Sequence, residues 1–254
     1  MDATNQPQPP VVLIAPAMAV GSRYYRPVIE EFRRHGWDAQ ALTRRGFELD
    51  APAASREHDW SYADEIDDIA GAVSAARDAH PGRPILLLGH SLGGQLVAGH
   101  EVTQPNVDGL ITVGGAFPHH RTYSYRGGGI WMFGALVIPA LTTLFGYVPK
   151  PAFGAPGART LMREWARIVV TGRPPFPTSS KVATPSLVIS LGDDRLAPRR
   201  AVEYFAHRMF DPAAMTRWHY ATSDVAPGDS NDHLGWARAP RGVVDHVVAW
   251  WGER

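Results

Sequence analysis

Short apolar runs, each ending at glycine, proline or a small residue, mark buried strands along this chain. The clearest is 85–88, four consecutive aliphatic residues between Pro84 and Gly89. An uninterrupted run of this kind is typical of a strand that is buried on both faces of a parallel sheet. Similar runs predict further strands at 11–17, 38–42, 109–116, 185–191 and 216–222.

Between these runs, apolar residues recur at helical spacing. The spacing predicts helices over 24–36, 61–79, 199–209 and 242–254. Four acidic residues stand near the start of the second of these helices, where the helix dipole favours anions, and we expect them to lie on a solvated face: Asp64, Glu65, Asp67 and Asp68. Strands that alternate with helices predict an α/β fold with a doubly wound, mostly parallel sheet.

The run at 85–88 leads directly into a G-x-S-x-G motif, Gly89-His90-Ser91-Leu92-Gly93. A serine on such a strand-to-helix turn is held in a strained backbone conformation, and the glycines are needed because a Cβ there would collide with the neighbouring strand and helix. The motif therefore predicts that Ser91 is exposed as a nucleophile at the carboxyl end of the sheet. We expect His90 to point away from the nucleophile and to serve in packing.

This motif in this context resembles the nucleophile elbow of the α/β-hydrolase superfamily. The stretches PAMAVGSRYYRP, DDRLAP and DHLGWAR resemble those of predicted serine α/β hydrolases from bacteria whose substrates are poorly defined, and the likeness runs from about Val11 to the C-terminus. The resemblance implies an α/β-hydrolase fold in which a carboxylate and a histidine follow the serine, in that order.

The acid is expected on the loop after the strand at 185–191. In the family pattern G-x-x-D-x-x-x-P the acid lies four residues before the proline, which favours Asp194 with Pro198. The spacing from Gly192 is one residue short, so Asp193 remains an alternative. Either residue is also suited to capping the helix that follows Pro198.

The base is expected among 11 histidines. His233, after the last strand, resembles the family's catalytic G-H-x-G-[FW], with Asp232 where a glycine is expected; its side chain either crowds or holds the loop. His219 and His246 fall inside a predicted strand and a predicted helix, where we expect core or surface roles. The pair His119-His120 lacks the further ligands of a metal site, so we expect no metal and no organic cofactor.

The oxyanion hole is expected from two backbone N–H groups. One belongs to Leu92, the residue after the nucleophile. The resemblance implies that the other comes from the loop after the first strand, where Pro16 and Ala17 replace the family's His-Gly and Met18 supplies the amide. The alternative is that Met18 only packs.

Residues 117–181 form a long excursion where the superfamily carries its cap, which divides the chain into a hydrolase core, 1–116 and 182–254, and a lid. The stretch 129–148 has no charge and is long enough to cross a membrane. A single crossing would separate Ser91 from the acid and the base, so we expect no membrane span. We expect instead an apolar lid over a hydrophobic pocket, kinked or broken at Pro139, with lipid docking of the same surface as an alternative.

Composition narrows the partners. Lys and Arg number 25 and Asp and Glu number 25, so nothing in the charge favours nucleic acid. The absence of cysteine excludes disulfides and thiol chemistry. The polar start, MDATNQPQPP, does not resemble a signal peptide, and we expect a cytoplasmic protein. No feature of the sequence indicates an oligomeric state.

The lid segment carries eight basic residues and one acid, Glu164. Because a cap that binds a free amino terminus needs carboxylates, an aminopeptidase is disfavoured. We expect a serine esterase that attacks a hydrophobic, small-molecule acyl substrate through an acyl-enzyme. An acyltransferase or thioesterase with the same three residues is one alternative, and a non-catalytic ligand-binding protein on the same fold is another.

Overall fold

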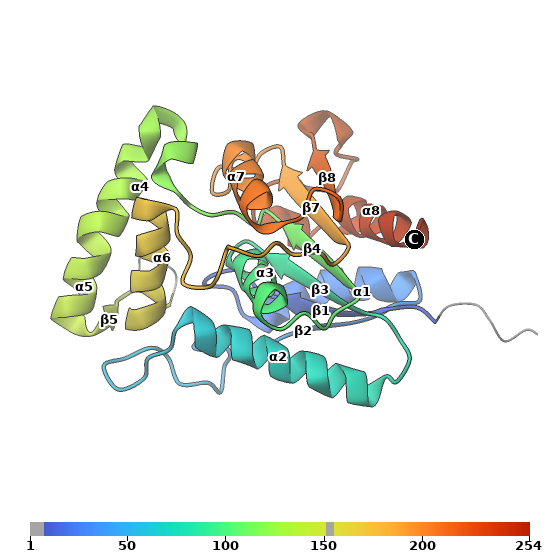
Figure 1. The fold of residues 1–254 in the computed structure, drawn as a ribbon, viewed down its shortest axis with the longest axis horizontal. Coiled ribbons are helices and arrows are strands. Elements are labelled where there is room, and N and C mark those ends of the chain that lie inside the picture. Colours follow the sequence, from blue (N-terminus) through green and yellow to red (C-terminus); the bar gives the residue numbers. More distant parts are fainter. Residues whose placement is uncertain (1–7, 151–154) are drawn as a thin grey trace, which may run out of the picture.

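The computed structural model describes residues 8–150 and 155–254, and its centre is a six-stranded sheet (Figure 1). The strand order is β2-β1-β3-β4-β7-β8, and every neighbouring pair is parallel. The fold is therefore the predicted doubly wound α/β sheet. Its strands are β1 (Val11–Ala15), β2 (Asp38–Ala41), β3 (Ile85–His90), β4 (Gly109–Val113), β7 (Ser186–Leu191) and β8 (Met215–Tyr220).

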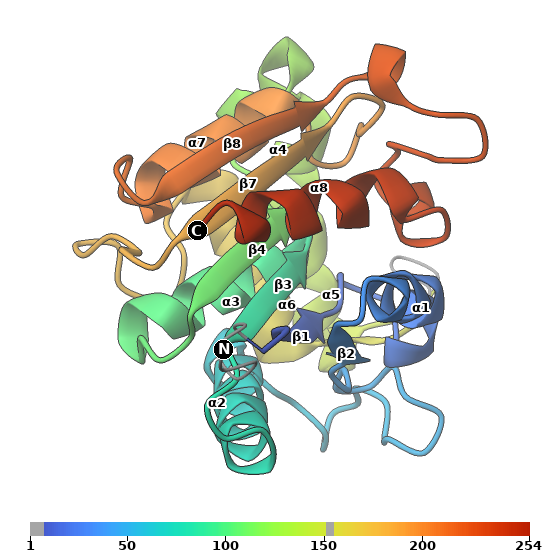
Figure 2. The same ribbon diagram turned by 90° about the vertical axis from the view of Figure 1, so that its right-hand side faces the viewer.

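Helices cover both faces of this sheet. In Figure 2, α1 (Arg26–Arg34) and α8 (Arg241–Gly252) lie on the viewer's side. Leu86 and Leu88 of β3 pack toward them, whereas Ile85 and Leu87 pack toward the opposite face. Every residue of β3 is buried, as expected for a central parallel strand. The opposite face is covered by α2 (Tyr62–Ala79), α3 (Leu92–Thr103) and α7 (Arg199–Met209).

Several predicted strands end earlier than the apolar run that predicted them. β1 ends at Ala15 and β4 at Val113, so the apolar residues that follow belong to loops. These loops leave the carboxyl edge of the sheet, where α/β proteins bind ligands. The expectation of a cytoplasmic protein was based on the N-terminal stretch MDATNQPQPP. Most of this stretch, 1–7, lies outside the described residues.

Glu65 does not lie on the solvated face expected for the acids of α2. Its side chain is buried, forms an ion pair with Arg44 at 2.9 Å and accepts a hydrogen bond from Trp60 Nε1 at 3.0 Å. Burial raises the pKa of Glu65, while the charge of Arg44 opposes this shift. Arg44 also donates to the carbonyl oxygen of Pro16 at 3.1 Å, so the pair supports the loop after β1.

The excursion after β4 forms a separate group of helices at one end of the molecule (Figure 1). This group is tied to the loop before α2: Asp59 accepts hydrogen bonds from Arg159 and Thr160, and Glu164 accepts one from the Tyr62 N–H. Its elements are η2 (His120–Thr122), η3 (Ser124–Gly127), α4 (Gly128–Met132), η4 (Phe133–Val137), α5 (Ile138–Phe145), β5 (Tyr147–Val148), β6 (Gly157–Ala158) and α6 (Arg159–Thr171).

The long apolar stretch is one helical run with a wide turn in its middle. The π-helical η4 separates α4 from α5, and Pro139 lies in the first turn of α5. The run widens before the proline and continues through it, so it is not broken at Pro139. By length and composition, Gly128–Phe145 could cross a membrane, with a mean hydropathy of 1.7 over 18 residues; 17% of that window is buried.

Candidate active site

Ser91 lies between β3 and α3 in the strained conformation that the motif predicts, with φ of 55° and ψ of −115°. Its N–H donates to the carbonyl oxygen of Val113 at 3.0 Å. A Cβ built on Gly93 would stand 2.1 Å from the Ala15 carbonyl oxygen, and one on Gly89 would stand 2.5 Å from the Gly93 carbonyl oxygen. The turn therefore requires glycine at both positions, because backbone atoms cannot give way as side chains can.

The structure brings together the serine, the histidine and one of the two candidate acids. His233 Nε2 lies 2.9 Å from Ser91 Oγ, and His233 Nδ1 lies 2.6 Å from Asp194 Oδ2. The Asp194 carboxylate is fully buried. In this arrangement the imidazole can accept a proton from the serine through Nε2. The carboxylate at Nδ1 holds the orientation of the ring.

Asp194 contacts the histidine and also holds its own loop, but it does not cap the helix after Pro198, since α7 has no side-chain cap. While Oδ2 contacts His233, Oδ1 accepts hydrogen bonds from the N–H groups of Leu196 at 2.9 Å and Ala197 at 2.7 Å. Asp193 is exposed and accepts a hydrogen bond from the hydroxyl of Thr222 at 3.2 Å. Of the two adjacent acids, Asp194 is thus the one that contacts the histidine.

Asp232, which stands in place of the expected glycine, holds the loop of His233. Its Oδ1 accepts hydrogen bonds from the N–H groups of Leu234 at 3.0 Å and Gly235 at 2.6 Å, and its Oδ2 accepts one from Ser230 Oγ at 2.8 Å. Partial burial acts to raise the pKa of Asp232, but these hydrogen bonds outweigh it and the pKa is lowered overall. The carboxylate therefore caps the turn that begins at the histidine.

Gly114, the residue after β4, also lies at the site, although no motif in the sequence pointed to it as a site residue. It has a positive φ of 57°, and a Cβ on it would stand 3.0 Å from Asp194 Oδ2 and 3.4 Å from His233 Nδ1. The residue therefore leaves room for the acid–histidine pair. The only signal for it in the sequence is the Gly114-Gly115 pair at the end of a predicted strand.

Met18 and Leu92 both line the cavity that contains Ser91 and His233. Leu92 is the first residue of α3, so its N–H has no partner within the helix and stands at the positive end of the helix dipole. The Ala17 N–H is already used, because it donates to the hydroxyl oxygen of Tyr25 at 2.8 Å. This contact leaves the amide of Met18, rather than that of Ala17, as the candidate oxyanion donor on the β1 loop.

The cavity has a volume of about 570 Å³ and is bounded mainly by apolar side chains. The helical excursion after β4 contributes Ile130, Phe133 and Trp165 to its wall. Gln95 is a polar wall residue whose groups are satisfied, since Nε2 donates to the Ala116 carbonyl and Oε1 accepts from Tyr62. The remaining wall residues are Ala17, Met18, Ala19, Val20, Ser91, Leu92, Gly114, Ala116, Pro118, Tyr123, Arg195, Leu196, Ala197, His233 and Leu234.

The other candidate histidines have partners outside this cavity. His120 Nδ1 bonds with the Val169 carbonyl at 3.0 Å, while His219 Nδ1 bonds with Ser190 Oγ at 2.9 Å. His246 stacks on Trp218 with ring centroids 3.8 Å apart. His90 is fully buried, as a packing residue would be, and it is also hydrogen-bonded at both ring nitrogens, which the sequence did not indicate.

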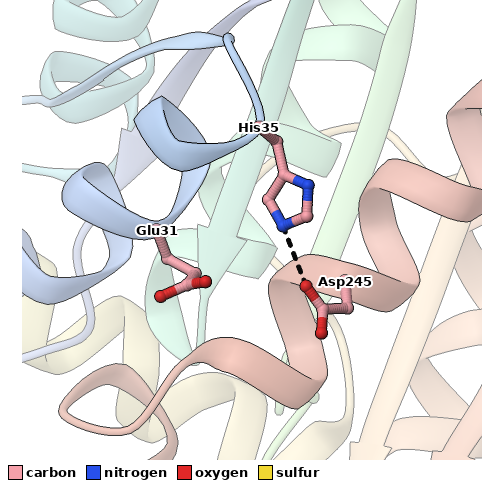
Figure 3. A group of neighbouring side chains, drawn as sticks. All are labelled: Glu31, His35 and Asp245. Atoms are coloured by element: carbon pink, nitrogen blue, oxygen red, sulfur yellow. Dashed lines mark hydrogen bonds and ion pairs between the residues drawn. The ribbon is translucent and has the colours of Figure 1, made fainter.

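One group of potential metal ligands occurs among the described residues, where α1 meets α8 (Figure 3). His35 Nε2 bonds with Asp245 Oδ1 at 2.8 Å, and Glu31, which stands apart from this contact, pairs with Arg34 at 2.6 Å. Each carboxylate thus has a partner already. We interpret the group as polar contacts that join the end of α1 to α8.

A family model described as "Serine aminopeptidase, S33" matches residues 6–147, more than half of the chain. No curated protein sequence gives a significant match.

Solved structures that resemble this one include hydrolases from several sources. A structure reported with LipS and LipT, two metagenome-derived lipolytic enzymes, has 15% identity and a TM-score of 0.65, covering 98% of this chain and 96% of that one. A pyrethroid hydrolase from Sphingobium faniae JZ-2 has 17% identity and a TM-score of 0.62, covering 95% and 96%. XC6422 from Xanthomonas campestris, a serine hydrolase without a lid, has 16% identity and a TM-score of 0.52, covering 98% and 85%. At these identities the likeness shows a shared fold.

Proposed function

This chain belongs to the S33 serine aminopeptidase family of α/β hydrolases, and from that premise we propose that it hydrolyses carboxylic esters through an acyl-enzyme at Ser91. The observation that carries the proposal is the contact of His233 Nε2 with Ser91 Oγ at 2.9 Å, together with that of His233 Nδ1 with Asp194 at 2.6 Å. Both contacts lie at the wall of an apolar cavity.

In the proposed reaction, Ser91 Oγ attacks the ester carbonyl while its proton passes to His233 Nε2. Asp194 keeps the imidazole oriented and stabilises the imidazolium. The N–H groups of Leu92 and Met18 stabilise the tetrahedral oxyanion, each contributing about 3 kcal/mol. His233 then protonates the leaving alkoxide, which departs as the alcohol. Water, deprotonated by His233, attacks the acyl-enzyme and releases the carboxylic acid.

The wall of the cavity supports an acyl substrate rather than a peptide amino terminus. Among the described residues that line it there is no carboxylate, and Arg195 is the charged side chain. A free ammonium group bound there would lack a counter-charge, which is costly in an apolar site. Although the family model carries the name of an aminopeptidase, the proposed substrate is therefore a neutral ester with a hydrophobic acyl group.

An acyltransferase or thioesterase activity shares the same acyl-enzyme and is the second candidate. The specific observation that favours it is Arg195, an exposed cation at the cavity wall beside the acid loop. An anionic leaving group or acceptor, such as a phosphate-bearing thiol carrier, would be attracted there. Transfer differs from hydrolysis only in the nucleophile that attacks the acyl-enzyme.

We further propose that residues 117–181 act as a lid whose outer surface touches lipid. Leu136 and Leu144 are 58% and 65% exposed, and Trp131 and Met132 are exposed on the same helical run. An apolar helix face with neighbouring basic residues is suited to an anionic lipid surface. Three exposed arginines of this segment are Arg121, Arg163 and Arg167.

Burst kinetics with p-nitrophenyl esters of increasing acyl length test this function. We expect a burst in the wild type and its loss in Ser91→Ala and His233→Ala. Asp194→Asn should lower kcat by about 10⁴-fold, because the imidazole loses the carboxylate that orients it. Asp193→Asn is the matched control and should retain nearly full activity.

Fluorophosphonate labelling separates the candidate functions. A wild type that shows neither turnover nor labelling of Ser91 would contradict the hydrolase proposal and favour the ligand-binding alternative. An active wild type that transfers its acyl group to an added alcohol or thiol faster than to water would favour the acyltransferase. The acyl length with the highest kcat/KM reports the size of the pocket.

A further inference from the structure

Resting on the proposed function, we propose that Tyr25 and His90 are positioning residues. They join the oxyanion loop, which follows β1 and carries Met18, to the loop of His233. Neither residue lines the cavity, and both are fully buried. Tyr25 comes from the short helix η1 (Ser22–Tyr25), and His90 is the last residue of β3, directly before the nucleophile. Their effect on the reaction is therefore through the residues they hold.

Three buried hydrogen bonds connect the two loops. The Ala17 N–H donates to Tyr25 Oη at 2.8 Å, and Tyr25 Oη lies 2.7 Å from His90 Nδ1. On the far side of the ring, His90 Nε2 lies 2.7 Å from the carbonyl oxygen of His233. The loop that carries Met18 and the loop that carries the base are thus ends of one continuous chain of polar contacts.

The direction of every hydrogen bond in this chain follows from its first member. The backbone N–H of Ala17 can only donate, so the Tyr25 hydroxyl accepts there and directs its own proton to His90 Nδ1. With Nδ1 as an acceptor, the proton of the neutral imidazole is on Nε2, and it is donated to the His233 carbonyl. Burial, reinforced by the charge of His233, holds the pKa of His90 well below its ordinary value, which keeps the ring in this neutral tautomer.

Packing fixes the His90 ring in the plane that these hydrogen bonds need. Trp236, which is fully buried, meets the ring edge-on with centroids 5.2 Å apart, and Tyr25 does so at 5.9 Å. The imidazole of His233 lies 5.1 Å from that of His90. A rotation of His90 would therefore disturb the base directly as well as through its carbonyl.

This arrangement has a consequence for the reaction geometry. Asp194 fixes the imidazole of His233 at its side chain, whereas His90 fixes the same residue at its backbone. Because Ser91 follows His90, one segment sets the nucleophile and anchors the base, and Tyr25 extends the anchor to the amide next to Met18. Loss of the chain should shift these groups relative to each other, and misplacement by about 1 Å can cost about 100-fold in rate.

The test compares Tyr25→Phe with Tyr220→Phe under the ester assay. Both substitutions remove one hydroxyl from a buried tyrosine and keep the ring, but the hydroxyl of Tyr220 has no hydrogen-bond partner among the described residues. We expect Tyr25→Phe to lower kcat and the rate of fluorophosphonate labelling by about 10- to 100-fold with KM nearly unchanged. Tyr220→Phe should keep the wild-type values.

A second pair keeps the inference testable if Tyr25→Phe does not fold. His90→Gln retains an N–H donor for the His233 carbonyl, whereas His90→Phe retains a ring and removes both hydrogen bonds. Partial recovery of kcat in the glutamine variant relative to the phenylalanine variant supports a positioning role. If the role of His90 were purely structural, kcat would not depend on whether residue 90 carries an N–H donor.

The outcomes distinguish this inference from the function on which it rests. An inactive, unlabelled wild type would overturn both. An active wild type with an equally active Tyr25→Phe, or with equal loss of kcat in His90→Gln and His90→Phe, would overturn the positioning role alone. A fall in kcat that Tyr220→Phe shares would overturn it too.

Discussion

Gly114 lies against the carboxylate of Asp194 so closely that a Cβ would stand 3.0 Å from Oδ2. A Cβ at this distance would be closer than ordinary van der Waals contact allows. The carboxylate is also held on its other oxygen by two backbone N–H groups. The acid therefore has little freedom to retreat from an added methyl group. The size of the residue after β4 thus controls whether Asp194 can reach His233.

We predict that Gly114→Ala lowers kcat by at least about 10-fold, because the methyl group displaces the acid–histidine pair. Its positive φ also costs about 1 kcal/mol of stability. Gly36→Ala is the matched control, since Gly36 has a φ of 75° with nothing within 4 Å of the new Cβ. It should lose similar stability in urea unfolding and keep full activity. Equal kcat in both variants would contradict the prediction.

The buried ion pair between Arg44 and Glu65 gives a prediction about stability. Glu65→Gln leaves the Arg44 charge buried without a counter-charge, so we expect a loss of about 3–5 kcal/mol in the free energy of unfolding. The exposed pair Arg45–Asp68 lies close by, and Asp68→Asn should cost less than about 1 kcal/mol. Urea denaturation of both variants makes the comparison.

The same pair should affect the oxyanion loop, because Arg44 donates to the Pro16 carbonyl. A double variant, Arg44→Met with Glu65→Leu, removes both charges and should recover most of the stability lost in Glu65→Gln. It should nevertheless lower kcat relative to the wild type, since the carbonyl of Pro16 loses the Arg44 donor. Full activity in the double variant would show that the loop does not need this support.

The pH dependence of stability should reveal that the pKa of His90 is lowered in the folded state. Its pKa is held well below 6.5 by burial, so the folded state leaves the ring neutral at a pH where the unfolded chain binds a proton. His90 therefore costs no stability above pH 6.5 and destabilises the fold as the pH falls below it, by at most about 1.4 kcal/mol per pH unit. The stability cost of His90→Gln, measured in urea, should be greatest at pH 8 and shrink toward pH 5.

His100 provides the control for this titration, because burial lowers its pKa as well and its ring lies on α3 away from the cavity. His100→Gln should show the same direction of pH dependence without a change in kcat. If the stability cost of His90→Gln does not vary between pH 8 and pH 5, protonation of His90 does not contribute to the pH dependence of stability.

The two sides of the lid should have separable effects. Phe133 lines the cavity, so Phe133→Ala should move the optimum of the ester series toward longer acyl chains. Leu136 is exposed, so Leu136→Ser should leave that optimum unchanged and weaken sedimentation with vesicles that contain anionic lipid. Vesicle binding by the wild type that equals that of Leu136→Ser would contradict the proposed lipid surface.

The sequence predicted the local features of this fold well. The run at 85–88 and the glycines beside Ser91 depend on contacts within one strand-turn-helix unit, and that unit appears as expected, with the positive φ at Ser91. The helix at 199–209 matches α7 at both ends. Such features depend on side-chain periodicity and backbone sterics, which are properties of neighbouring residues.

Where the sequence left alternatives, the missing information was a direction in space. Asp193 and Asp194 have the same chemistry and adjacent positions, but the chain after β7 turns one toward His233 and the other toward Thr222. Glu65 looked like its acidic neighbours, yet its position on α2 faces Arg44 across 21 residues of sequence. The spacing to Pro198 favoured Asp194 but left Asp193 as an alternative, and no local pattern set Glu65 apart, because the partners of these residues are distant in the chain.

By itself, the sequence determined the α/β class, the order of strands and helices, the nucleophile turn and a short set of acid and base candidates. Those follow from apolar periodicity, glycine sterics and chain order. Only the tertiary structure decided which polar groups meet: Asp194 with His233, Arg44 with Pro16, and Tyr25 with His90. The physical reason is that a buried polar group must find a partner, and the packing of distant segments selects that partner.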